Sequence, residues 1–106
     1  MMSGAAATIE KLAQRAGDAA QLMKLLANET RLLILCRLVA EREMSAGAIV
    51  AAAGLGQSAV SQHLARLRDD NLVATRREGQ TIYYRIADKN AARIIALLKD
   101  IYCRDA

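Results

Sequence analysis

The hydrophobic period of this chain changes at Asn71. Before Asn71, apolar residues recur at spacings of three and four, as in helices; after it they alternate, as in strands. Glu78-Gly79-Gln80 separates two alternating segments, Leu72 to Arg77 and Thr81 to Ile86, which predicts a β-hairpin with glycine at its turn. The 106 residues therefore suit one domain, 1–106, that is mainly α with a β-hairpin.

Capping residues locate the helices that precede the hairpin. Asn28 can cap a helix that ends at polar residues 41–43, and Ser45 can cap a short helix that stops at Gly54, which is free to take the left-handed conformation. A further helix covers about residues 57–70. The buried face of the helix after Asn28 is predicted to contain Leu32, Leu35, Cys36 and Val39.

Two short helices joined by Gly54-Leu55-Gly56 and followed by a hairpin are typical of the winged helix–turn–helix, a DNA-binding fold. The helix–turn–helix spans about residues 45–70, and the wing spans about 72–86. The second helix of the pair has an apolar side suited to the core and an opposite side of uncharged polar groups suited to base edges. A merely solvated polar face is the alternative. The outward residues are Gln57, Ser58, Ser61, Gln62 and Arg66.

Other candidate DNA contacts lie near this helix. Arg76, Arg77 and Gln80 lie at the hairpin tip, where they could reach phosphates or a minor groove. His63 is the only histidine, and it could contact DNA or be partly buried. The net charge of +4 permits a nucleic-acid partner. Glu41 and Glu43 are interpreted as solvated charges at a helix end.

The N-terminal segment carries a narrow apolar stripe on a predicted first helix of about 18 residues. Such a stripe can pack onto the chain's own core, but its narrow, heptad-like spacing favours a dimer seam. Its members are Ile9, Leu12, Ala16, Ala19, Met23 and Leu26. Asp88 can cap a last helix, whose apolar side is Ile94, Leu97, Leu98, Ile101 and Tyr102.

Three segments together resemble the ArsR/SmtB family of winged-helix transcriptional repressors. They are Asn28-Glu29-Thr30-Arg31-Leu32-Leu33-Ile34-Leu35, Gln57-Ser58-Ala59-Val60-Ser61-Gln62-His63-Leu64 and Arg76-Arg77-Glu78-Gly79-Gln80-Thr81-Ile82-Tyr83-Tyr84. The resemblance implies a homodimer, joined through its first and last helices, that binds operator DNA until an inducer releases it. The interface would then contain Ile9, Leu12, Ala16, Ala19, Met23, Ile94, Leu98 and Ile101.

The cysteines indicate what the protein senses. The short third helix has no Cys and the last helix has no His, unlike the metal-sensing members of the family, so no metal site and no cofactor are expected. Cys36 and Cys103 resemble in position the pair of the dithiol HlyU/BigR/SqrR type, which responds to reactive sulfur species or oxidants. The alternatives are a metal-responsive repressor and a regulator whose cysteines are core residues.

Other classes of protein are less compatible with the sequence. It has no catalytic Ser/His/Asp or Cys/His set and no phosphate-binding glycine loop, so an enzyme is not expected. Residues 44–65 lack charged side chains but contain too many polar and glycine residues for a membrane span. No signal peptide is evident at residues 1–20, and a cytoplasmic protein with reduced thiols is expected. A winged helix that binds only proteins is a further alternative.

Overall fold

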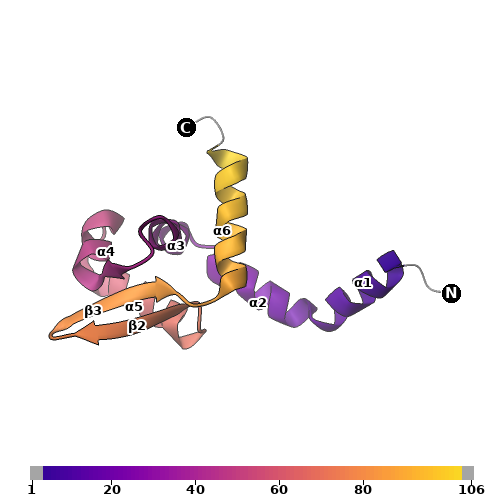
Figure 1. Cartoon of the computed structure of the whole chain (residues 1–106), viewed down its shortest axis with the longest axis horizontal. Helices are drawn as coiled ribbons and strands as arrows, with labels where there is room; N and C mark the ends of the chain where they lie inside the picture. Colours follow the sequence, from indigo (N-terminus) through magenta and orange to yellow (C-terminus); the bar gives the residue numbers. More distant parts are fainter. Residues whose placement is uncertain (1–3, 104–106) are drawn as a thin grey trace.

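The computed structural model describes residues 4–103, and it confirms a mainly helical winged helix–turn–helix (Figure 1). Over this range the elements are α1 (Gly4–Gln14), α2 (Ala16–Leu26), α3 (Glu29–Glu41), β1 (Met44–Ser45), α4 (Ala46–Ala53), α5 (Gln57–Asp69), β2 (Val73–Glu78), β3 (Thr81–Ile86) and α6 (Lys89–Tyr102). Helices α4 and α5 form the helix–turn–helix, and β2 and β3 form the wing.

The wing belongs to an antiparallel sheet of three strands, in the order β1-β3-β2. The hairpin register pairs Glu78 with Thr81, which leaves a two-residue turn at Gly79 and Gln80. Gly79 has a φ of 62°, in the left-handed region that favours glycine. Strand β1 was not predicted; it pairs with β3 and immediately precedes α4, so hydrogen bonds join the wing to the helix–turn–helix.

Side-chain caps begin three of the helices at the predicted residues. The Asn28 side chain accepts a hydrogen bond from the Arg31 amide at 3.0 Å, and the Ser45 hydroxyl accepts one from the Ala48 amide at 3.1 Å. Asp88 Oδ1 accepts from two amides at the start of α6. Gly54 ends α4 with a φ of 69°. These local interactions fix where α3, α4 and α6 lie along the chain.

The core lies between α3, α5, α6 and the sheet, and side chains from most elements contribute to it. The predicted buried face of α3 was partly wrong, because only Leu35 of its four members is fully buried and the other three are half-buried at its edge. The helix packs against α4, α5, α6 and β3, so its buried surface is wider than one stripe and includes Ile34 and Leu38. The buried side chains are Leu25, Leu26, Ile34, Leu35, Leu38, Ile49, Val60, Leu64, Leu67, Leu72, Val73, Ala91 and Ile95.

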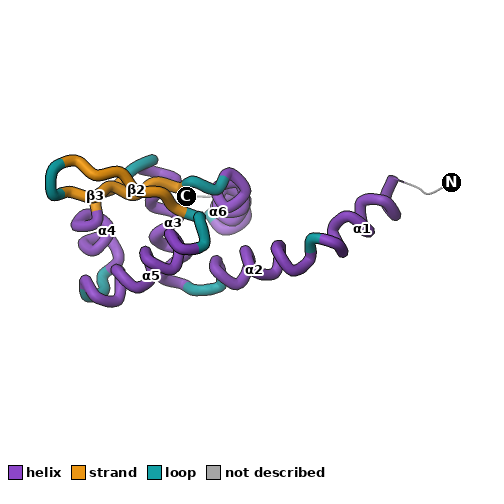
Figure 2. Tube along the Cα trace, turned by 90° about the horizontal axis from the view of Figure 1, so that it is seen from below, coloured by secondary structure: helices purple, strands orange, loops and turns teal. Residues whose placement is uncertain are grey.

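The predicted single first helix is two helices, interrupted at Arg15. The Arg15 amide donates to the Lys11 carbonyl at 3.3 Å, as in an α-helix, and also to the Leu12 carbonyl at 3.0 Å, the bond of a tighter 3₁₀ turn. Gly17 lowers helix propensity just beyond this point, and the Arg15 side chain donates to Asp18 at 2.8 Å. Figures 1 and 2 show α1 projecting away from the body of the domain.

Helix α6 also differs from its prediction. Its fully buried side chains are Ala91 and Ile95, which were not on the predicted apolar side. Of that predicted side, Leu97, Ile101 and Tyr102 are 57%, 52% and 80% exposed. Ile94 and Leu98 are half-buried. The helix therefore has a second apolar face that the chain's own core does not cover.

Candidate nucleic-acid interface and cysteine pair

Helix α5 presents the polar surface that the sequence predicted. Val60, Leu64 and Leu67 are buried against the core and fix its orientation. On the opposite side the side chains are exposed, apart from the half-buried His63. Arg66 approaches Asp70 at 3.7 Å, with both side chains open to solvent. The exposed predicted contacts are Gln57, Ser58, Ser61, Gln62 and Arg66.

The two arginines of the wing lie on opposite faces of strand β2. Side chains alternate along a strand, and the register places Arg77 beside Ile82 and Arg76 beside Tyr83. The face with Arg77 is the one whose buried residue, Val73, packs against the helices. Figure 2 shows α4 and α5 on one side of the hairpin. Arg77 therefore lies on the helix–turn–helix side and Arg76 on the far side; Gln80 is exposed at the turn.

Arg76 is held in place by two carboxylates and an aromatic ring. Its Nε and Nη2 donate to the two carboxylate oxygens of Glu43 at 2.8 and 2.7 Å, and its Nη1 donates to Glu78 at 2.9 Å. The guanidinium carbon lies 4.3 Å from the centre of the Tyr83 ring. Hydrogen bonds from Arg76, and the positive charge of Arg85 nearby, lower the pKa of Glu43.

Glu43 forms a structural contact that was not predicted from the sequence. It was interpreted as a solvated helix-end charge, and the structure corrects this, since it forms a bidentate ion pair with Arg76. The partners are 33 positions apart, and Glu43 precedes the two-residue strand β1, which has no recognisable pattern of its own. No local sequence signal could have indicated the pair.

Cys36 lies on α3 and Cys103 lies directly after α6, and these two helices pack against each other. Cys36 is half-buried at the edge of the core, and Cys103 is exposed directly after α6; both are free thiols. Burial raises the pKa of Cys36, the Lys99 ammonium acts in the opposite direction, and the negative charge of the Cys103 thiolate raises it further. The fold thus brings Lys99 and Cys103 within electrostatic reach of Cys36.

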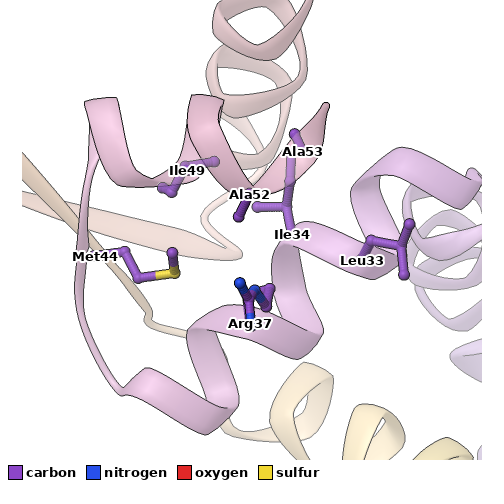
Figure 3. Close-up of a pocket in the computed structure, with 7 residues that line it drawn as sticks. All are labelled: Leu33, Ile34, Arg37, Met44, Ile49, Ala52 and Ala53. Atoms are coloured by element: carbon purple, nitrogen blue, oxygen red, sulfur yellow. The ribbon is translucent and has the colours of Figure 1, made fainter. Parts of the chain in front are cut away.

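A small apolar hollow lies between α3, α4 and β1 (Figure 3). Its volume is about 20 Å³, room for about one water molecule. Its lining is Leu33, Ile34, Arg37, Met44, Ile49, Ala52 and Ala53. Arg37 supplies the only charge, so the hollow lacks the convergent polar groups of a ligand site.

Residues 4–103 contain neither a metal-binding cluster nor a membrane-spanning helix. In that part of the chain, no three side chains among His, Cys, Asp and Glu gather where they could hold a metal ion. Within the same residues, no helix is both long and apolar enough to cross a bilayer.

Comparisons with known proteins agree with the geometry of the fold. A profile described as "Bacterial regulatory protein, arsR family" matches residues 28–75. The transcriptional activator HlyU of Vibrio cholerae serotype O1 is 41% identical over 103 residues, which are 97% of this chain and 94% of that protein.

Two solved structures are similar over most of their length. Reduced HlyU from Vibrio cholerae N16961 has a TM-score of 0.82 at 42% identity, covering 89% of this chain and 98% of that one. The transcriptional repressor BigR from Xylella fastidiosa has a TM-score of 0.83 at 38% identity, covering 89% of this chain and 95% of that one.

An exposed polar helix beside an antiparallel wing defines a winged-helix DNA-binding protein. The identity and coverage of the relatives specify it further: the chain belongs to the ArsR family of bacterial regulatory proteins. This is a non-enzymatic family of transcriptional regulators that bind operator DNA.

Proposed function

We propose that this chain is a cytoplasmic, homodimeric repressor whose operator binding is modulated by reactive sulfur species or oxidants through Cys36 and Cys103. The observation that carries the proposal is the position of Cys36 on α3 and of Cys103 directly after α6, two helices that pack together, with Cys103 near enough for its charge to raise the pKa of Cys36. The similarity to HlyU, solved in a reduced form, and to the repressor BigR supports it.

Operator recognition is assigned to α5 and the wing. The exposed hydrogen-bonding groups of α5 suit the major groove, and a dimer would read two half-sites about one helical turn or a multiple apart. Arg77 and Gln80 at the wing tip would contact phosphates or the minor groove. Arg76 is distinctive among the predicted contacts, because its guanidinium already donates to two carboxylates. The α5 contacts are Gln57, Ser58, Ser61, Gln62, His63 and Arg66.

Dimerisation is assigned to α1, α2 and α6. In the single chain Ile9, Leu12 and Met23 are 68%, 61% and 56% exposed, and no residue of α1 is buried. A run of exposed apolar side chains of this kind is typical of an interface. Small residues at Ala16 and Ala19 allow a close approach of helices. On α6 the interface would take Ile94, Leu98 and Ile101.

The thiol chemistry joins α3 to α6. A cysteine thiolate attacks the outer sulfur of a persulfide, the donor's thiolate leaves, and the cysteine becomes a persulfide. The second thiolate then attacks the inner sulfur and expels hydrosulfide, which leaves a disulfide. The alternative product is a polysulfide: when both cysteines are persulfides, the outer sulfur of one attacks the inner sulfur of the other, expels hydrosulfide and leaves a trisulfide. Peroxide gives the disulfide through a sulfenic acid, releasing one water molecule in each of its two steps.

The bond would act on DNA binding through α3. This helix packs against α4 and α5, so fixing it to α6 changes how the helix–turn–helix is held relative to the dimer seam. Closing the loop between residues 36 and 103 stabilises the folded state over the unfolded state by roughly 4 kcal/mol in the chain-entropy model. A coupling of about 1–3 kcal/mol changes an affinity by about 5- to 150-fold.

Intact mass and DNA binding, measured on the same samples, test the proposal. Wild type, Cys36→Ser and Cys103→Ser are assayed before and after a persulfide donor, on a duplex selected from a random library by the reduced protein. An intramolecular sulfur bridge that requires both cysteines and weakens binding supports the switch. A DNA affinity that changes with neither the persulfide donor nor peroxide contradicts the proposal. A response to Zn²⁺ alone favours the metal-responsive alternative.

A further inference from the structure

The wing of this protein carries two adjacent arginines that differ in every contact. We infer that Arg76 is a positioning residue that ties the wing to the segment before β1, and that Arg77 alone supplies the charged contact of the wing with the DNA backbone. The inference rests on DNA binding through the wing. It assigns different roles to side chains that the sequence does not distinguish.

The alternation of side chains along β2 separates the two arginines. Arg77 shares a face of β2 with Val73, which packs against the helix–turn–helix, whereas Arg76 shares the other face with Glu78. A duplex in contact with α5 approaches the wing from the side of the helices. Arg77 lies on that side, and Arg76 lies across the sheet from it.

The guanidinium of Arg76 is already engaged by two carboxylates. Each of its three nitrogens donates to a carboxylate, and Glu43 accepts in the parallel, bidentate geometry that only arginine can satisfy. Two carboxylates surround one guanidinium, so the immediate group carries excess negative charge, which Arg85 offsets. Three of the five N–H groups of Arg76 are thus committed to carboxylates, so a phosphate would gain less from Arg76 than from an unpaired guanidinium.

The ion pair of Arg76 with Glu43 connects two distant parts of the sheet. Glu43 precedes β1, Arg76 belongs to β2, and both β1 and β2 pair with β3, where Tyr83 lies under the guanidinium. The contact therefore spans the full width of the sheet at its outer face. Because α4 follows β1 directly, holding this end of the sheet also holds the wing relative to the helix–turn–helix.

Salt dependence of DNA binding separates the two roles. Each phosphate contact contributes about one unit to the slope of log K against log[salt]. Arg77→Ala is expected to reduce that slope by about one, and Arg77→Lys to retain it. Arg76→Ala and Glu43→Gln are both expected to leave the slope unchanged and to weaken binding by about 2- to 10-fold, the cost of ordering a loosened wing.

Conservative and paired substitutions sharpen the comparison. Arg76→Lys is expected to behave as Arg76→Ala, because an ammonium cannot reproduce the bidentate geometry. The double variant, Arg76→Ala with Glu43→Gln, should lose no more DNA-binding affinity than either single variant, because both substitutions break the same ion pair. A slope reduced by about one in Arg76→Ala, or tighter DNA binding in Glu43→Gln, overturns the inference, because either result means that Arg76 contacts phosphate.

Hydrogen exchange of the wing provides a readout without DNA. Arg76→Ala and Glu43→Gln are expected to speed amide exchange over residues 74–84, while Arg77→Ala leaves it unchanged. Unchanged exchange in both of the first two variants overturns the positioning role. If the wild type failed to bind any duplex, the proposed function would fail, and the exchange rates would still decide whether Arg76 holds the wing.

Discussion

Burial raises the pKa of Cys36 on α3, and Lys99, one turn before the end of α6, acts in the opposite direction. The two residues belong to helices that the core packs together, so a charge on one helix is felt by the thiol on the other. Lys99 therefore tunes the thiolate fraction of Cys36, which is the reactive form of the residue.

The first prediction concerns the pH dependence of Cys36 alkylation in a Cys103→Ser background. Because burial raises the pKa above its ordinary value of 9.0, the rate should still be rising with pH at that value. Lys99→Met removes the opposing charge and should shift the profile to higher pH. Lys89→Met, at the other end of α6, is the matched control and should leave the profile in place; mass spectrometry measures the rates.

The second prediction concerns the core at α3. Leu35 is fully buried, and Leu35→Ala should lower the free energy of unfolding by about 2–5 kcal/mol, because it leaves a cavity among side chains that pack densely. Leu33, two positions earlier on the same helix, is 56% exposed. Leu33→Ala should lower the free energy of unfolding by no more than about 0.5 kcal/mol. Urea unfolding at one protein concentration measures both, and equal losses would contradict the assigned core.

The third prediction concerns the start of α6. Asp88 accepts from the amides of Asn90 and Ala91 at 2.8 and 3.0 Å. Asp88→Ala leaves both donors without this acceptor and should destabilise the protein by about 0.5–2 kcal/mol. Asp88→Ser keeps a capping oxygen and should recover most of the loss. If the serine variant were as unstable as the alanine variant, the cap would not be the cause.

The fourth prediction concerns self-association. Leu12→Glu places a charge on the exposed stripe of α1 and should convert a dimer into monomers at micromolar concentration. Leu55 is 41% exposed in the turn between α4 and α5, outside the proposed seam. Leu55→Glu should leave the dimer intact. Sedimentation velocity distinguishes the two, and a Leu12→Glu variant that remained dimeric would place the interface elsewhere.

Much of the fold could be predicted because the relevant interactions are local. Asn28, Ser45 and Asp88 cap helices whose amides lie two or three residues away, and Gly54 and Gly79 take the positive φ values that their turns need. Each of these signals is contained within a few residues of sequence. The exposed polar face of α5 was predicted in the same way, from the helical spacing of its polar and apolar residues.

Other features depend on contacts that a period does not encode. Helix α6 is apolar on two sides, and its sequence alone does not reveal that Ala91 and Ile95 face the core while Leu97 and Ile101 do not. The ion pair of Glu43 with Arg76 requires the hairpin to fold back beside β1. Two-residue strands and distant ion pairs arise only from tertiary packing.

Strand β1 has a consequence for the entropy of binding. Its two residues, Met44 and Ser45, pair with Tyr84 and Tyr83, and the next residue begins α4. The wing therefore loses much of its conformational freedom relative to α5 when the chain folds, before any duplex is present. A partner that meets a surface already ordered in this way has less disorder to remove, and more of the contact energy remains as affinity.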